Sequence, residues 1–202
     1  MPRPDALIFD LDGTLWDTVD ACVRAWNRVL PAFEPGRTVD RSFMVGLMGK
    51  SHRELRREEP EEALRACYQE ELRQIRAGGF TLYPGVADGI RELQRMLPLY
   101  LVSNCEKDYL DAFLSDSGIG DAFAAALCHG QTGRPKGENL ARLVSDRRLG
   151  SAPYVGDTAS DHRAARTAGL EYWHMDYGFG SPAGPCRSFA TFGGLVRHLR
   201  HA

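Results

Sequence analysis

The stretch LIFDLDGTLWDT, residues 7–18, places two acidic residues directly after a short apolar run. The run ALIFD (6–10) is typical of a buried parallel strand, and it ends on Asp10. Asp12 follows two residues later, so in extended chain both carboxylates face the same side. Gly13 then allows the chain to turn sharply. The stretch therefore predicts a buried strand that carries a pair of acids to the edge of a sheet.

After residue 80, short apolar strands alternate with helical patterns. This alternation is typical of an α/β domain with a mostly parallel sheet. The predicted fold is therefore a Rossmann-like, doubly wound α/β core. The expected strands lie at 99–103, 125–128, 153–157 and 171–175, and the expected helices at 86–97, 106–116, 137–148, 159–168 and 193–201.

Residues 17–80 show a helical pattern instead. Apolar residues recur there at spacings of three and four, and Ser51 and Glu54 are spaced as a capping box. We therefore expect this block to be an all-helical insertion, with residues 1–16 and 81–202 forming the α/β core. Its expected elements are a helix from Asp17 to Phe33, a loop at 34–40, and helices at 46–58 and from Pro60 to about Arg76.

The composition excludes several classes of protein. The 202 residues carry a net charge of −2 and no basic stretch, so nucleic acid is not an expected partner. The five cysteines are odd in number and form no C-x-x-C pair, which favours a reducing compartment over disulfides or a zinc site. No signal core or membrane-length apolar run is present, so we expect a cytoplasmic protein with no membrane partner. The sequence gives no indication of an oligomeric state.

Polar residues follow the predicted strands at the points where each strand ends. Ser103 and Asn104 follow the strand at 99–103. Asp157 ends the strand at 153–157, and Asp161 lies in the first turn of the next helix. Ligands of parallel sheets bind outside the carboxyl ends of the strands, so we expect these residues to meet Asp10 and Asp12 there.

Such a cluster has a definite chemical requirement. Carboxylates packed together repel one another unless a cation lies between them, and oxygen ligands without His or Cys favour Mg²⁺. Lys136, at the start of a predicted helix, suits a phosphate group beside that metal. Each residue also has an ordinary alternative: the D-G-T and Ser-Asn pairs as turns, Asp157 and Asp161 as helix caps, and Lys136 as a surface charge.

Four segments in this order resemble the motifs of the haloacid dehalogenase superfamily: FDLDGTLWDT, LVSN, RPKGEN and VGDTASD. The insertion at 17–80 is similar to the helical cap of phosphoglycolate phosphatase-like members. The resemblance implies a phosphoric monoester hydrolase that depends on Mg²⁺ and works through an aspartyl-phosphate. It implies a small phosphate ester as substrate: phosphoglycolate-like, a sugar phosphate or a nucleotide.

The resemblance also implies roles for the acids and the lysine. Asp10 would be the nucleophile, Asp12 the group that protonates the leaving oxygen and then activates water, and Lys136 the cation that neutralises charge at the reacting centre. Asp10, the backbone carbonyl of Asp12, and Asp157 would ligate Mg²⁺. Asp161 would bind it through water or orient another ligand.

Five further residues are expected to bind substrate. Ser103 and Asn104 would hold phosphoryl oxygens, and Thr14 of the D-G-T segment is grouped with them. Trp16 either lines the mouth of the cavity or packs under the cap. Lys50 is one of only three lysines among 25 basic residues and lies between two predicted cap helices. It therefore either contacts the leaving group or is a solvated loop residue.

Two other functions stay open. A sugar phosphomutase would share the fold, although such mutases carry a cap histidine where this chain has Cys22. A non-catalytic protein that senses Mg²⁺ or phosphate is the alternative outside enzymes. Dehalogenases and phosphonate hydrolases are disfavoured because they lack the second acid, Asp12.

Overall fold

The computed structural model describes residues 3–50 and 60–201 and centres on a six-stranded parallel sheet. The strand order is β5-β4-β1-β6-β7-β8. The first strand of the chain therefore lies inside the sheet, between β4 and β6, which makes this a doubly wound α/β fold as predicted. The strands are β1 (Leu7–Phe9), β4 (Leu99–Ser103), β5 (Phe123–Cys128), β6 (Tyr154–Gly156), β7 (Tyr172–Met175) and β8 (Arg187–Phe189).

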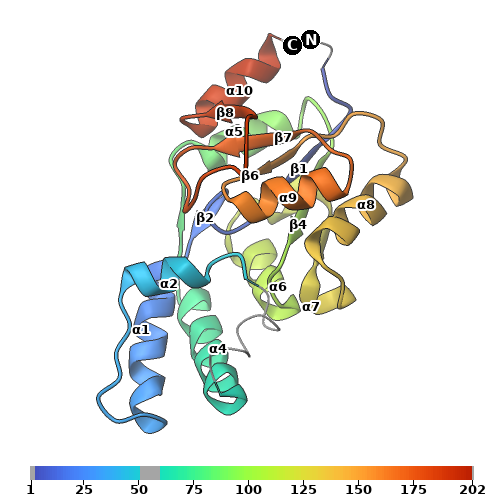
Figure 1. The fold of residues 1–202 in the computed structure, drawn as a ribbon. Coiled ribbons are helices and arrows are strands. Elements are labelled where there is room, and N and C mark those ends of the chain that lie inside the picture. Colours follow the sequence, from blue (N-terminus) through green and yellow to red (C-terminus); the bar gives the residue numbers. More distant parts are fainter. Residues whose placement is uncertain (1–2, 51–59, 202) are drawn as a thin grey trace.

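Both faces of the sheet are buried because its strands present apolar residues in both directions. Leu7 and Phe9 of β1 join one hydrophobic cluster and Ile8 joins the other. The face with Leu7 and Phe9 is covered by α5 (Val86–Leu93), α6 (Lys107–Asp116) and α10 (Phe192–Arg200), and the face with Ile8 by α8 (Lys136–Arg147) and α9 (Ala159–Thr167) (Figure 1).

None of the helices in the described part of the chain is long and apolar enough to cross a membrane.

The insertion is helical and lies beyond one end of the sheet, on the side away from the two chain termini (Figure 1). It has a hydrophobic cluster of its own, which includes Val19, Trp26 and Leu64. This arrangement is consistent with the expected cap, and the boundaries at 17 and 80 stay a prediction. Its elements are α1 (Val19–Val29), the short 3₁₀ helix η1 (Leu30–Ala32), α2 (Arg41–Leu47) and α4 (Glu61–Arg76).

A small antiparallel ribbon joins the insertion to the core. Its strands are β2 (Trp16–Asp17) and β3 (Thr81–Leu82), with Trp16 paired to Leu82 and Asp17 to Thr81. The chain thus leaves the core and returns to it at neighbouring points. At two residues each, these strands are too short for the period-2 pattern that predicts strands from sequence.

The structure differs from the predicted elements at several places. Residues 41–45 carry no expected element and residues 46–47 belong to the helix expected at 46–58. Residues 41–47 instead form α2, because Asp40 caps the helix by accepting a hydrogen bond from the Phe43 backbone at 2.8 Å. The helix predicted at 46–58 is therefore wrong at its start, and its capping pair, Ser51 and Glu54, lies outside the described residues. The short elements β8, η2 (Gly120–Ala122) and α7 (His129–Thr132) were also not predicted.

Candidate active site

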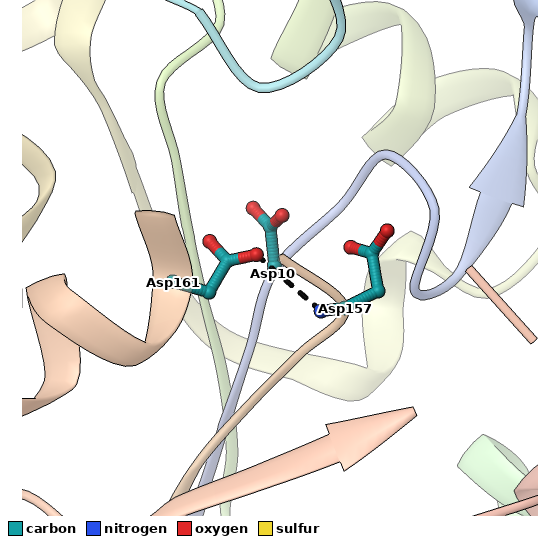
Figure 2. A group of neighbouring side chains, drawn as sticks. All are labelled: Asp10, Asp157 and Asp161. Carbon is teal, nitrogen blue, oxygen red and sulfur yellow. Dashed lines mark hydrogen bonds between the residues drawn. The ribbon is translucent and has the colours of Figure 1, made fainter. Parts of the chain in front are cut away.

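Three buried carboxylates meet at the carboxyl ends of β1 and β6. Asp10 follows β1, Asp157 follows β6, and Asp161 lies in the first turn of α9. Since β1 and β6 pair in parallel, their ends lie next to each other. One oxygen from each carboxylate lies within 4.8 Å of the others, and Figure 2 shows the three side by side. The predicted convergence of these acids is therefore present.

Lys136 supplies the positive charge against this cluster. It is the first residue of α8, and its Nζ donates hydrogen bonds to Asp10 Oδ1 at 2.9 Å and to Asp161 Oδ1 at 2.7 Å. Burial by itself would lower the pKa of Lys136, but the two carboxylates raise it above its ordinary value. Lys136 is thus a charged buried lysine, and the alternative of a solvated surface lysine does not hold.

The pKa of each acid reports how its charge is compensated. Burial, followed by the nearby Asp161, raises the pKa of Asp10 to about 7 even though Lys136 opposes the shift. Burial acts against ionisation of Asp161 as well, but Lys136 and Thr158 lower its pKa below the ordinary value. Burial and the two other acids raise the pKa of Asp157 well above its usual range. Full ionisation of the three acids would therefore require more positive charge than Lys136 alone supplies.

Asp157 is fixed by neighbours that leave no space for larger side chains. Its Oδ1 accepts a hydrogen bond from Thr14 Oγ1 at 3.1 Å, and its Oδ2 accepts one from the Phe179 backbone at 2.7 Å. A Cβ added to Gly13 would lie 2.1 Å from Asp157 Oδ2, and one added to Gly178 would lie 2.2 Å from its Cβ. Gly13 also has a φ of +79°, which other residues rarely adopt. Both glycines are thus required by their close approach to Asp157.

Asp161 is held on both of its oxygens. Its Oδ2 accepts hydrogen bonds from the Thr158 backbone at 3.0 Å and the Thr158 hydroxyl at 2.6 Å, while Lys136 binds Oδ1. Asp161 is therefore a helix-capping residue, as the ordinary alternative proposed, and a member of the acid cluster. The dashed line in Figure 2 marks a further hydrogen bond, from the Asp157 backbone.

Asp12 lies apart from the cluster and has different partners. Its Oδ1 accepts hydrogen bonds from Trp16 Nε1 at 2.9 Å and Tyr109 Oη at 2.6 Å, and Tyr109 is in turn 2.7 Å from Thr18 Oγ1. Burial raises the pKa of Asp12 to about 6, although Tyr109 and Trp16 act to lower it. A carboxyl with this pKa can both donate and accept a proton near neutral pH. Tyr109 was not predicted, because an aromatic residue on α6 reads as an ordinary core residue.

The residues predicted to bind substrate are placed unequally. Ser103 ends β4 beside the acids and accepts a backbone hydrogen bond from Cys105 at 3.2 Å, while Asn104 donates to the Gly49 carbonyl at 2.8 Å. Thr14 and Trp16 are both fully buried. Thr14 donates a hydrogen bond to Asp157 and Trp16 donates one to Asp12, so both side chains hold acids in place.

A cavity of about 100 Å³ lies between the core and the insertion. Asp10, Asp12 and Ser103 lie on its core side, so it opens onto the acids and the end of β4. Lys50 lines the same cavity, and its contact with a substrate stays a prediction. The insertion also contributes Cys22, Trp26, Met44, Leu47, Met48, Tyr68 and Glu71.

The fold and the site together define an α/β protein with a cluster of buried carboxylates at the ends of its central strands. The family model of the haloacid dehalogenase-like hydrolases matches residues 7–174, and the chain belongs to this family. The predicted family and the predicted class of enzyme, a phosphatase-type hydrolase, are thereby confirmed.

Relatives and solved structures agree with this assignment. A phosphoglycolate phosphatase of Synechococcus elongatus is 32% identical over 186 residues, covering 86% of this chain and 84% of the relative. A phosphoglycolate phosphatase of Chromobacterium violaceum is 29% identical over 191 residues, covering 86% of each. The crystal structure of a predicted phosphatase from Clostridium acetobutylicum is similar with a TM-score of 0.82 over 100% of both chains. At 19% identity this last likeness shows the fold alone.

Proposed function

We propose that the protein is a cytoplasmic Mg²⁺-dependent phosphatase that hydrolyses a small phosphate monoester through an aspartyl-phosphate on Asp10. The observation that carries this proposal is the pairing of Asp10 with Lys136 inside the cluster of Asp157 and Asp161. A buried nucleophile at the end of a central strand, held by a lysine, suits attack on an anionic phosphoryl group. The names of the relatives support phosphoglycolate and similar small phosphates as the first substrates to test.

The donor set fits Mg²⁺. The oxygens of the three carboxylates lie within 4.8 Å of one another, and among the described residues no histidine or cysteine belongs to the cluster. Asp10, Asp157 and the backbone carbonyl of Asp12 would hold the ion, with Asp161 beside them. When bound, Mg²⁺ supplies the positive charge that offsets the carboxylates and phosphoryl oxygens.

The residues of the chain account for both steps of the proposed reaction. An Asp10 oxygen attacks phosphorus while the bond to the leaving oxygen breaks, and Asp12 gives that oxygen its proton. Asp12 then accepts a proton from the water that attacks phosphorus, and the bond to Asp10 breaks to release phosphate. Lys136 stabilises negative charge throughout, and Ser103 and Asn104 are the proposed partners of the phosphoryl oxygens.

Catalysis also requires that bulk water is kept from the intermediate. The cavity lies between the acids and the helical insertion, so we infer that residues 17–80 act as the cap over a core of 1–16 and 81–202. We also infer that residues of the insertion choose the substrate, since the core side of the cavity holds the groups proposed to react.

The test is a panel of phosphate esters assayed for phosphate release, with Mg²⁺ and again with excess chelator. We expect steady release that chelator abolishes, Mg²⁺ restores, and Ca²⁺ restores poorly because its coordination is larger and looser. An isomeric sugar phosphate forming without free phosphate would show a mutase instead. No turnover of any ester, together with binding of phosphate and Mg²⁺, would leave the sensing protein as the better description.

A further inference from the structure

One side of the cavity carries an acid that the proposed reaction does not use. Glu71 lies on α4 at a position that its apolar stripe would normally fill, four residues after Cys67 and four before Ile75, both buried. Carboxylates at such positions are rare without a charged partner, because removing them from water is costly. The sequence contains this signal, since an acid at position 71 interrupts the apolar period of an amphipathic helix.

Among the described residues, the neighbours of Glu71 hold it in place and none of them pairs with its charge. Trp26 Nε1 donates a hydrogen bond to Glu71 Oε1. Cys22, which lies on α1 like Trp26, is a second neutral neighbour of the Glu71 carboxylate. In the described ranges, 3–50 and 60–201, no Arg, Lys or His is in ion-pair contact with it. Burial raises the pKa of Glu71 to about 7, and Asp12 adds to the shift. An acid fixed in this way and facing a cavity is suited to accept hydrogen bonds from whatever enters.

The rest of this side of the cavity is largely apolar. Trp26, Met44 and Met48 line it together with Glu71, and Lys50 and Tyr68 are the other polar side chains that the insertion contributes. Such a surface packs against carbon atoms and offers a few polar anchors, which is the usual construction of a small-molecule site. The acids Asp10 and Asp12 lie at the core end of the same cavity, so a phosphate ester bound at Asp10 would extend its alcohol portion toward α4.

We propose that Glu71 selects the leaving group of the phosphatase, accepting a small alcohol whose tail carries a hydroxyl or ammonium donor and excluding one that ends in a carboxylate. This inference rests on the proposed function, because it concerns the same cavity and the same reaction. A donor-bearing tail satisfies the acceptor capacity of Glu71, whereas a carboxylate tail brings a second negative charge into a partly desolvated space. The inference therefore predicts that this chain differs in substrate from the phosphoglycolate phosphatases it resembles.

The experiment measures kcat/KM with Mg²⁺ at about pH 8, above the raised pKa of Glu71 of about 7, so that its carboxylate is ionised. The four esters are glycerol 3-phosphate, phosphoethanolamine, phosphoglycolate and phenyl phosphate. Their tails carry, in turn, hydroxyls, an ammonium, a carboxylate and no hydrogen-bonding group. The parent protein is compared with Glu71→Gln, which keeps an oxygen for Trp26 but replaces the other with an amide donor. Glu70→Gln is the matched control, because Glu70 is the preceding acid on α4, pairs with Arg73 and does not line the cavity.

We expect the parent to favour the two donor-bearing esters over phosphoglycolate by at least about tenfold, the value of one hydrogen bond to a charged group. Glu71→Gln should lower kcat/KM for phosphoethanolamine by about tenfold and raise it for phosphoglycolate by a similar factor, because repulsion is replaced by a donor. Phenyl phosphate should change by less than about twofold, since it makes no contact of this kind. Glu70→Gln should leave all four values unchanged.

Two results would overturn the assignment. One is a parent that prefers phosphoglycolate to both donor-bearing esters. The other is a Glu71→Gln variant that changes all four substrates by the same factor, which is what a purely structural role through Trp26 predicts. Should Glu71→Gln fold poorly, Glu71→Asp keeps the charge and must still exclude phosphoglycolate. Failure of the proposed function is distinct, because the parent would then release no phosphate even from phenyl phosphate.

Discussion

The core presents buried acids to the cavity and the helical insertion presents the half-buried Glu71, and the charges of the two are compensated differently. In the core, Asp10 and Asp161 share Lys136, whose Nζ lies within 2.9 Å of each. In the described part of the insertion, Glu71 accepts hydrogen bonds from neutral donors of α1. Compensated charge suits groups that must react with an anion, whereas an uncompensated acid discriminates among the neutral, cationic and anionic parts of a ligand. We therefore assign the phosphoryl-transfer reaction to the acids of the core and the choice of substrate to Glu71 of the insertion.

The strongest test of the core is Asp10→Asn. The amide cannot act as the nucleophile, so kcat should fall at least about 10³-fold on every ester, while the fold is retained. Phosphate release, and circular dichroism as the check on folding, are the measurements. Substantial turnover in a pure sample would show that Asp10 does not form the covalent bond. The core acids would then no longer be the reacting groups in the contrast with Glu71.

Asp12→Asn should have the next largest effect, and an uneven one. Alkyl phosphates need a proton on their leaving oxygen, so their kcat should fall by about 10²-fold or more, whereas aryl phosphates with good leaving groups should lose much less. A plot of log kcat against leaving-group pKa for parent and variant measures the difference. Equal losses across the series would contradict the role of Asp12 as the acid, although its role as the base would survive.

Lys50→Ala sharpens the comparison from the cavity side. If Lys50 contacts a remote anionic group, the variant should raise KM for an acidic substrate by about tenfold and leave phenyl phosphate nearly unchanged. A fall in kcat is also expected where that contact helps the cap to close. The contrast should be largest in the Glu71→Gln background, where the carboxylate tail is no longer repelled. Equal losses on both substrates, or none on either, would show that Lys50 does not choose the substrate.

The smallest expected effect is on stability. The pKa of Glu71 is raised from 4.5 in the unfolded chain to about 7 in the fold, so the folded state is disfavoured as pH rises between these values. Glu71→Gln carries no such penalty. Its melting temperature should match the parent near pH 4 and exceed it by a few degrees at pH 8, because 1 kcal/mol shifts Tm by about 2–4 °C in a chain of this size. A constant difference at every pH would mean that the Glu71 carboxyl is not desolvated.

Much of the fold could be predicted because its signals are local. The strand at 99–103 was predicted with the bounds it has, since a continuous apolar run between turn residues leaves little choice. The strands β2 and β8 were missed because their pairing depends on distant partners: Trp16 pairs with Leu82, and Trp173 with Arg187. The position of α2 differs from the prediction for a local reason, since Asp40 lies in the loop expected at 34–40 but is the N-cap of this helix.

In the candidate site, too, local sequence signals identify residues but do not predict their contacts with distant partners. Thr14 is grouped with the expected substrate-binding residues, and Trp16 is expected either at the mouth of the cavity or packed under the cap. Both side chains are buried, and they donate hydrogen bonds to Asp157 and Asp12. Their contact with a substrate stays a prediction. Asp161 was proposed either as a cap or as a member of the acid cluster, and the structure gives it both positions. A sequence names the groups that are present at a strand end, but it does not say which atom of each group is used.

By itself, the sequence determined the α/β core, the helical insertion and the order of the four motifs, because periodicity and turn residues act over neighbouring positions. Only the tertiary structure decided that Lys136 lies between Asp10 and Asp161, that Tyr109 donates to Asp12, and that Glu71 faces the same cavity. Lys136 is 126 residues from Asp10 along the chain, and Tyr109 is 97 from Asp12. Contacts over such separations are set by how whole elements pack, and that packing depends on the burial of both faces of the sheet at once.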